Sequence, residues 1–142
     1  MRTIRFELPY PTKLLNQVLR MHWSARGRYQ RRLSWDVKIT MGQQRPAEPF
    51  ARARLRIERH SIGRADEDGA IGGYKHLIDC LLPPGATRIV KGKPVLAHPC
   101  GLSVIADDNP DCLVADYPPP VRVAHARDQK TIVVIEELPM SA

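Results

Sequence analysis

The sequence predicts an α+β fold (α/β mixed) in which a mixed β-sheet packs against two main helices. Three observations support this prediction: short segments with alternating apolar and polar residues, two segments with helical periodicity, and a β-branched run near the end of the chain. The elements follow in the order β-α-β-α-β-β, with one more short strand allowed. A chain of 142 residues fits a single domain over residues 1–142.

The first strand and the first helix are defined by their periodicity. Residues 3–8 (TIRFEL) alternate, which predicts a strand with one buried face. After a loop over residues 16–23, Ser24 is a candidate N-cap for a helix that begins near Ala25 and ends near Gly42. The apolar stripe of this helix recurs every four residues, at Tyr29, Leu33, Val37 and Met41.

The second predicted strand is rich in arginine. Residues 50–60 (FARARLRIERH) alternate, and the apolar face carries Ala51, Ala53, Leu55 and Ile57. The polar face carries Arg52, Arg54, Arg56 and Glu58. Three arginines on one strand face form a basic ladder suited to phosphate groups. An ordinary solvated strand face explains the same pattern equally well.

The second half of the chain predicts one helix and several short strands. Residues 68–82 (DGAIGGYKHLIDCLL) have helical periodicity, and residues 83–102 read as an extended loop because they are rich in proline and glycine. Short strands are predicted at 103–106, 113–117 and 121–124. The β-branched run at residues 131–136 predicts a last strand in the centre of the sheet.

Charge divides unevenly along the chain. Residues 1–64 carry fifteen Lys or Arg against four acids, a balance of +11, and residues 65–142 carry seven against eleven, a balance of −4. A basic first half favours a polyanionic partner, because neutralising phosphates releases condensed counterions. No run approaches the roughly 18 apolar residues of a membrane span, and the N-terminus lacks a signal-peptide pattern. We therefore expect a cytoplasmic protein with no membrane partner.

The three cysteines, Cys80, Cys100 and Cys112, form no CxxC pair, and their odd number argues against a disulfide framework. We interpret them as buried small residues or incidental thiols. A zinc site built from His98, Cys100 and Cys112 is an alternative, although the spacing is not specific.

The acidic segment that starts at Asp66 is the first candidate for chemistry. Asp66, Glu67 and Asp68 stand together at the expected start of the helix, where the helix dipole stabilises negative charge. The helical spacing also places Asp68, Gly72, Lys75 and Asp79 on one face. Such a polar stripe is unusual for a solvated helix. The plain alternative is an acidic helix start with an i,i+4 ion pair between Lys75 and Asp79.

A second acidic cluster follows a predicted strand, with Asp107, Asp108 and Asp111 in the segment DDNPD. Mg²⁺ prefers oxygen ligands, and carboxylates supply them. A nuclease uses such ions to activate water and to stabilise the leaving 3′-oxygen. Acids at a strand end and at a helix start can converge when the two elements pack together.

The order of these motifs resembles that of RusA-type Holliday-junction resolvases, over about Thr3 to Glu136. Leu8-Pro9-Tyr10-Pro11 followed by Asn16 matches the opening LPxPxxxN of the family, with a spacer one residue longer. Further matches are the paired aspartates Asp66 and Asp68, the helical Lys75 and Asp79, and the late pair Asp107-Asp108. The GGxK variant before the lysine looks like the phage and prophage branch of the family.

The resemblance implies a RusA-like fold and a homodimer that cuts four-way DNA junctions by paired nicks, with Mg²⁺, or Mn²⁺ as a substitute, as cofactor. It implies no small-molecule substrate. It assigns Asp66, Asp68 and Asp108 to the metal ions, with Glu67 and Asp107 as reserve ligands. Lys75 would stabilise transition-state charge or position the scissile phosphate. The candidate contacts to the DNA backbone are Arg52, Arg54, Arg56 and Arg64.

Two positions depart from the family pattern. Gly69 stands where the family usually has Asn, and the loop at residues 83–102 is longer than in compact members. A rival hypothesis is therefore a DNA-junction-binding module in which the acids are structural or the site is inactive. A third hypothesis is an RNA-binding protein. Trp23 is a candidate for base stacking, although we favour a role as a core anchor.

Overall fold

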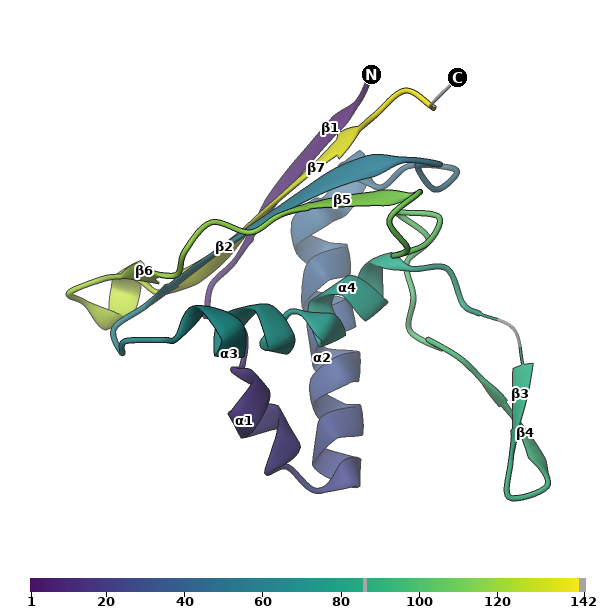
Figure 1. Ribbon diagram of the computed structural model, residues 1–142, viewed down its shortest axis with the longest axis horizontal. Helices are drawn as coiled ribbons and strands as arrows, with labels where there is room; N and C mark the ends of the chain where they lie inside the picture. Colours follow the sequence, from purple (N-terminus) through teal and green to yellow (C-terminus); the bar gives the residue numbers. More distant parts are fainter. Residues whose placement is uncertain (86, 141–142) are drawn as a thin grey trace.

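The computed structural model describes residues 1–85 and 87–140, and it is an α+β fold (Figure 1). The main sheet consists of β1 (Thr3–Leu8), β2 (Ala53–Ser61), β5 (Leu113–Asp116), β6 (Val121–Arg122) and β7 (Lys130–Glu137). The strand order is β1-β7-β2-β5, and β6 also pairs with β2. β7 runs antiparallel to both neighbours, whereas β5 and β6 run parallel to β2, so the sheet is mixed. The predicted central position of the last strand is confirmed.

The edge of the sheet at β1 is closed by a side chain. The amide of Gln44 accepts a hydrogen bond from the backbone N–H of Arg5 at 3.0 Å and donates one to the Arg5 carbonyl oxygen at 2.9 Å. Gln44 belongs to the short 3-10 helix η1 (Gly42–Gln44), which follows the long helix α2. One side chain therefore supplies the pairing that a further strand would give at this position.

The helices cover one face of the sheet, and Figure 1 shows α2 crossing behind the strands. They are α1 (Leu15–Leu19), α2 (Trp23–Met41), α3 (Glu67–Gly73) and α4 (Lys75–Leu81), with a 3-10 turn η2 (Ala126–Asp128) near the C-terminal strand. The predicted stripe of α2 is largely buried, with Leu33 and Val37 fully enclosed. Alternate residues of β1, β2 and β7 complete the same core.

The opposite face of the sheet is open and carries paired charges. Cross-strand and neighbouring ion pairs join four cations to four carboxylates on this face. The cations are Arg5, Arg54, Arg56 and Lys130, and the carboxylates are Glu7, Glu58, Asp116 and Glu136. This face, which we call the open sheet face, is thus electrically balanced among its paired residues.

A small hairpin forms a second sheet. Strands β3 (Thr87–Val90) and β4 (Lys93–Leu96) are antiparallel and are joined by Lys91 and Gly92, both with positive φ. Positive φ at both central residues is the signature of a type I′ turn, whose twist suits a two-residue hairpin. Figure 1 shows the hairpin projecting away from the helices and the main sheet. The prediction of an extended loop over 83–102 was therefore wrong for residues 87–96, which form this hairpin.

The predicted helix over residues 68–82 is two helices. The chain breaks at Tyr74, whose N–H bonds to the carbonyl of Ile71 three residues earlier instead of four. Glycine disfavours a helix interior, and Gly73 is required here by packing: a Cβ on it would lie 2.0 Å from the carbonyl oxygen of Lys13. A Cβ on Gly72 would lie 2.8 Å from Leu15 Cδ2. Gly72 therefore makes room for α1 and is not part of a polar face shared with Asp68 and Lys75.

Three further sequence predictions about the N-terminal half were wrong. The segment 16–23 contains most of α1, because Leu15 and Val18 pack toward the rest of the molecule. The N-cap of α2 is His22, whose ring nitrogen accepts from the N–H of Ser24 at 3.2 Å, so the helix begins at Trp23. Trp23 is 73% exposed and is not a core anchor.

Two predictions about strands also need correction. Residues 103–106 form only one isolated bridge, between Ile105 and Phe50, because their N–H groups are used elsewhere. The N–H groups of Val104 and Ile105 donate to the carbonyl of Leu81 and so cap the end of α4. Ala51 is exposed, since β2 begins only at Ala53. Within the described ranges, no helix is long and apolar enough to cross a membrane.

Candidate functional site

Lys75 lies between two carboxylates that come from different parts of the chain. Its ammonium Nζ is 3.1 Å from Asp79 Oδ1 and 3.1 Å from Asp108 Oδ2. Asp79 is one turn along α4, as the i,i+4 spacing predicts, and Asp108 is 33 residues away in the sequence. The sequence predicted that the second acidic cluster converges with the acids at the start of the helix; the contact found is between Asp108 and Lys75 in the first turn of α4.

The position of Asp108 follows from the way its segment docks. Backbone N–H groups of residues 102–105 bond to the last carbonyls of α4, and Phe50 holds the other side of the segment through Ala106 and Val104. Gly101 makes this docking possible, because a Cβ there would lie 2.0 Å from the carbonyl oxygen of Leu82. The loop over residues 107–111, which we call the acidic loop, is thus held to the end of α4 through the docked segment 102–106.

The two carboxylates keep Lys75 charged. Partial burial lowers the pKa of the Lys75 ammonium, but the hydrogen bonds and charges of Asp79 and Asp108 outweigh burial, and the net pKa is raised. A lysine with a raised pKa is a cation at neutral pH and does not serve as a base. The cluster of one ammonium and two carboxylates therefore carries a net negative charge, and Lys75 is a cation whose position both carboxylates fix.

This cluster borders a groove of about 320 Å³. Its lining includes Lys75, Asp107, Asp108 and His98, together with Gly85 and Ala97 at the base of the β3–β4 hairpin. Gly85 and Ala97 are joined by a backbone hydrogen bond of 2.7 Å. The acidic loop, the first turn of α4 and the root of the hairpin therefore share one concave surface, which we call the Lys75 groove.

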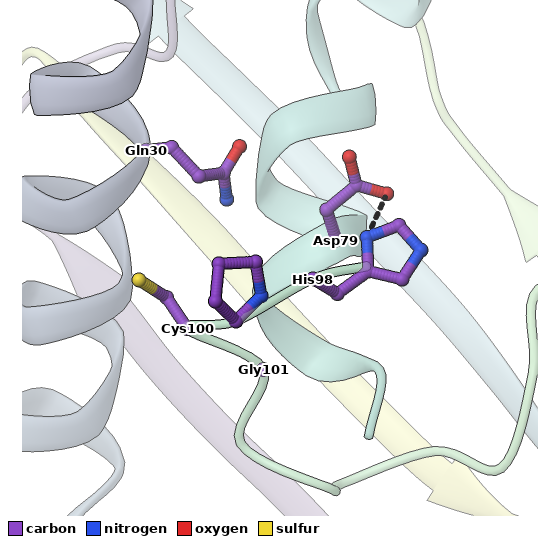
Figure 2. Close-up of a pocket in the computed structure, with 6 residues that line it drawn as sticks. Gln30, Asp79, His98, Cys100 and Gly101 are labelled. Atoms are coloured by element: carbon purple, nitrogen blue, oxygen red, sulfur yellow. Dashed lines mark ion pairs between the residues drawn. The ribbon is translucent and has the colours of Figure 1, made fainter. Parts of the chain in front are cut away.

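A smaller cavity of about 140 Å³ lies on the other side of Asp79 (Figure 2). Figure 2 shows Gln30 from α2 and Asp79 from α4 approaching it from two helices, with His98, Cys100 and Gly101 from the intervening loop. His98 Nδ1 lies 3.7 Å from Asp79 Oδ1. The same oxygen, Asp79 Oδ1, thus lies near both Lys75 Nζ and His98 Nδ1, and His98 borders both cavities.

The first acidic cluster is used by its own helix. Asp66 is the N-cap of α3, and its Oδ2 accepts the N–H of Gly69 at 3.0 Å. Glu67 and Asp68 follow in the first turn and are exposed. A Cβ on Gly69 would lie 2.5 Å from Asp66 Oδ1, so any side chain there would displace the capping carboxylate. The alternative of an acidic helix start describes Asp66 well.

Asp107 also has a local role. Its Oδ1 accepts the N–H of Asp108 at 2.7 Å, and its Oδ2 accepts the side chain of Asn109 at 2.9 Å. These hydrogen bonds lower the pKa of Asp107, the backbone one most strongly. Asp107 therefore shapes the acidic loop, and Asp108 is the member of the pair that faces Lys75.

The predicted metal ligands fit Mg²⁺ in chemistry but not in placement. Asp66, Asp68 and Asp108 offer the carboxylate oxygens that a hard cation takes. Asp66 and Asp68 stand at the start of α3, where Asp66 caps the helix, whereas Asp108 pairs with Lys75 on α4. In residues 1–85 and 87–140, no three His, Cys, Asp or Glu side chains are grouped to hold a metal ion. The same finding applies to the zinc alternative with His98, Cys100 and Cys112.

The basic surface nearest the site is on α2. This helix carries Arg26, Arg28, Arg31, Arg32 and Lys38 against a single carboxylate, Asp36. α2 packs directly on α4, since Gln30 Nε2 donates to the backbone carbonyl of His76 at 2.8 Å. The positive helix and the Lys75 cluster therefore lie side by side.

The predicted arginine contacts lie on surfaces of different character. Arg54 is paired with Glu136 at 3.2 Å, and Arg56 with Asp116 at 3.1 Å, both on the open sheet face. This pairing favours the alternative of an ordinary solvated strand face for these two residues. Arg64 is exposed at the entry to α3, and Arg52 is half-buried just before β2.

Sequence reasoning gave no role to Gln30 or to the buried Arg59, and it considered His98 only as a zinc ligand. Gln30 and His98 had no spacing signal, because the loop that returns His98 to Asp79 is irregular. Arg59 is 5% exposed; its Nε donates to the carbonyl of Thr12 at 2.7 Å and its Nη1 to Ser61 Oγ at 2.9 Å. The alternation of β2 could have indicated this position: Arg59 is two residues after the buried Ile57, so it lies on the same, inner face of the strand.

The cysteines are free, which agrees with the predicted absence of a disulfide framework. Burial raises the pKa of Cys80 to about 12, so it is a neutral thiol among the core residues.

Comparison of the chain with known protein families, curated proteins and solved structures found no match.

Proposed function

We propose that this chain is a Mg²⁺-dependent, structure-specific DNA endonuclease that acts as a homodimer on four-way junctions, in the manner of RusA-type Holliday-junction resolvases. The proposal rests on the order of sequence motifs that resembles this family, together with one structural observation. That observation is the Lys75 ammonium held between Asp79 and Asp108 in a groove beside the basic helix α2.

Phosphodiester hydrolysis uses a cation near the phosphate, and this groove holds one in Lys75, beside Asp79 and Asp108. Negative charge develops on the phosphate as water attacks the phosphorus and the 3′-oxygen leaves, and a fixed cation stabilises that charge. Lys75 is the candidate for this role, and Asp79 positions it from one turn away. α2 offers five cations on the adjoining helix for neighbouring phosphates of the same nucleic acid.

The proposed cofactor is Mg²⁺, with Mn²⁺ as a substitute, held by Asp66, Asp68 and Asp108. When bound, such an ion activates water and neutralises charge on the phosphate. This part of the proposal requires the carboxylates to lie closer together than they do in the structure, with Asp66 released from the N-cap of α3. In such sites one or two carboxylates and a substrate phosphate share the ion.

A second candidate function is a DNA-junction-binding module without catalysis. The observation in its favour is that Asp66, Asp108 and Asp107 each have a structural partner, respectively the α3 N-terminus, Lys75 and the acidic loop. The basic helix α2 would serve binding in either case.

One assay separates the two functions. A labelled four-way junction is incubated with the protein and Mg²⁺, with Mn²⁺, and with EDTA, and the products are resolved on a denaturing gel. Paired, metal-dependent nicks support the endonuclease, while binding without nicks in either metal supports the module. Tighter binding to structured RNA than to the junction would remove both in favour of an RNA-binding protein.

The Asp68→Asn variant tests the assignment of the acids. Asp68 is exposed in the first turn of α3, so the fold should tolerate the change. We expect cutting to be abolished and junction binding to be retained or improved, because a negative charge near the phosphates is removed. Asp111→Asn is a matched control. Asp111 is also exposed and acidic, but it follows the Asp107–Asp108 pair in the acidic loop and is not one of the proposed metal ligands. Joint loss of binding and cutting in Asp68→Asn would indicate a folding role instead.

A further inference from the structure

The β3–β4 hairpin, residues 87–96, stands at the edge of the Lys75 groove. Its root is the hydrogen-bonded pair Gly85 and Ala97, and both residues line the groove together with Lys75 and Asp108. Figure 1 shows the two strands extending from this root into solvent. The hairpin is therefore attached to the proposed active site and leads away from it.

The hairpin has no interior of its own. Every residue of β4 is exposed, and Ile89 on β3 is 71% exposed. The cross-strand pairing places Ile89, Pro94 and Leu96 on one face of the ribbon, and Val90, Lys93 and Val95 on the other. An isolated two-stranded hairpin is at best marginally stable in water. This ribbon is thus expected to gain order from a partner.

The charge of the hairpin indicates which class of partner it binds. Residues 87–96 (TRIVKGKPVL) contain three basic residues and no acid, although the second half of the chain is acidic overall. Lys91 at the turn and Lys93 beside it are both exposed. A cationic tip on an apolar ribbon is complementary to a polyanion with apolar groups between its charges, which describes a DNA groove.

The dimensions agree with this partner. Four residues per strand at about 3.3 Å each give a ribbon about 13 Å long. The major groove of B-form DNA is about 12 Å wide and 8.5 Å deep, and it admits a two-stranded β-ribbon. A ribbon rooted beside Lys75 can therefore enter the major groove next to a phosphate that lies in the Lys75 groove.

We propose that the β3–β4 hairpin is a DNA-binding arm that enters the major groove of the duplex adjoining the cleavage site. This inference rests on the proposed function, because it takes the phosphate at Lys75 as the reference point. Lys91 and Lys93 contact the DNA backbone, and Ile89 contacts the groove floor or the methyl groups of thymine. The arm sets where along the duplex the phosphate is placed.

Lys93→Glu is the principal test, with Arg127→Glu as the matched control. Both positions are exposed and both changes shift the charge by the same amount, but Arg127 lies in η2 near β6, at the opposite end of the molecule from the hairpin (Figure 1). We expect Lys93→Glu to weaken junction binding about tenfold in EDTA and to make its salt dependence shallower by about one unit of slope. Arg127→Glu should change affinity by less than about twofold, and equal effects of the two variants would overturn the inference.

Protection of guanine N7 from dimethyl sulfate tests the groove itself, because N7 lies in the major groove. Wild type should protect guanines within about half a turn of the nick, and Ile89→Ser should lose this protection. Unchanged protection in Ile89→Ser would overturn the inference. So would conversion of a wild-type dimer to a monomer by Ile89→Ser with DNA affinity unchanged, because the hairpin would then cover a second copy of the chain.

The two proposals fail in different ways. A wild-type protein that neither binds nor cuts a junction removes the proposed function. A wild-type protein that binds and cuts, while Lys93→Glu behaves as Arg127→Glu, removes only the DNA-binding arm. Equal melting temperatures of the two variants will show that any difference between them does not come from loss of folding.

Discussion

The two arginine-rich elements of this chain, strand β2 and helix α2, present different surfaces. On the open sheet face, the charges of Arg54 and Arg56 are matched by carboxylates from β7 and β5. On α2, five cations face one carboxylate, Asp36, which also accepts the hydroxyl of Tyr10 and pairs with Arg32. β2 carries three arginines, of which Arg59 is buried, and α2 carries five Lys or Arg; only α2 keeps an excess of exposed positive charge.

The difference shows that strand order determines the net charge of a surface. β2 lies between β7 and β5 in the sheet, so acids distant in sequence are brought opposite its arginines. α2 has solvent along its outer side, and its charges have fewer opposite neighbours. Since association with a polyanion depends on net local charge, α2 is a stronger candidate for a nucleic-acid interface than the open sheet face.

The largest effect is expected at Lys75. Lys75→Ala removes the fixed cation of the groove and should lower the cleavage rate by about 10²–10³-fold at unchanged junction affinity, which is the usual effect of losing one electrostatic contact to a transition state. Lys130→Ala is the control, because Lys130 is also ion-paired, with Glu7 at 3.7 Å, but on the open sheet face. Single-turnover cleavage assays measure both; similar rates for the two variants would refute the distinction between the surfaces.

A smaller effect is expected on binding through α2. The double variant Arg28→Ala/Arg31→Ala removes two exposed cations of this helix. Junction affinity should fall about tenfold, and the slope of log affinity against log salt should fall by about two. Fluorescence anisotropy at four salt concentrations measures the slope. An unchanged slope would place α2 away from the DNA.

A still smaller effect is expected from the corresponding change on the open sheet face. Arg54→Ala/Arg56→Ala removes the same number of charges, but these charges are already paired. We expect affinity to change by less than about twofold and the free energy of unfolding to fall by less than about 1 kcal/mol per exposed ion pair. If the slope of log affinity against log salt falls as much as in the α2 variant, Arg54 and Arg56 contact the DNA after all.

The smallest effect is a dependence of stability on alkaline pH. The pKa of Lys75 is raised above its ordinary 10.5, so its ion pairs stabilise the fold below about pH 10 and are lost as pH rises through the folded-state value. Between pH 8 and pH 11, wild type should lose slightly more free energy of unfolding than Lys75→Met, by less than about 1 kcal/mol for a half-exposed pair. Denaturant titrations at the two pH values give this difference, and a larger loss in Lys75→Met would contradict the assignment.

Much of the fold was predictable because its signals are local. The alternation in residues 3–8 and 50–60 and the β-branched run at 131–136 correctly gave three neighbouring strands, and the α2 stripe gave its core face. The break at Tyr74 was not predictable in the same way. It depends on Lys13 passing within contact distance of Gly73, a meeting of segments 60 residues apart.

The candidate site was predictable in part for the same reason. Helical spacing predicts the pair Lys75 and Asp79, whereas the contact of Asp108 with Lys75 was not predicted, because it depends on how residues 102–106 dock on α4 and Phe50. Asp66 can either cap α3 or bind a metal ion, and the sequence pattern is compatible with both roles. The pairing of Arg54 with Glu136 depends on strand order, which no periodicity reveals.

The amide of Gln44 that closes the β1 edge has a consequence for self-association. A strand edge with free N–H and C=O groups invites a second molecule to extend the sheet, and Gln44 occupies both groups of Arg5. Two copies of this chain therefore have little to gain by joining their sheets across β1. A symmetric pair would instead meet through side chains on another surface, and a Gln44→Ala protein would be the one prone to form ribbons and aggregates.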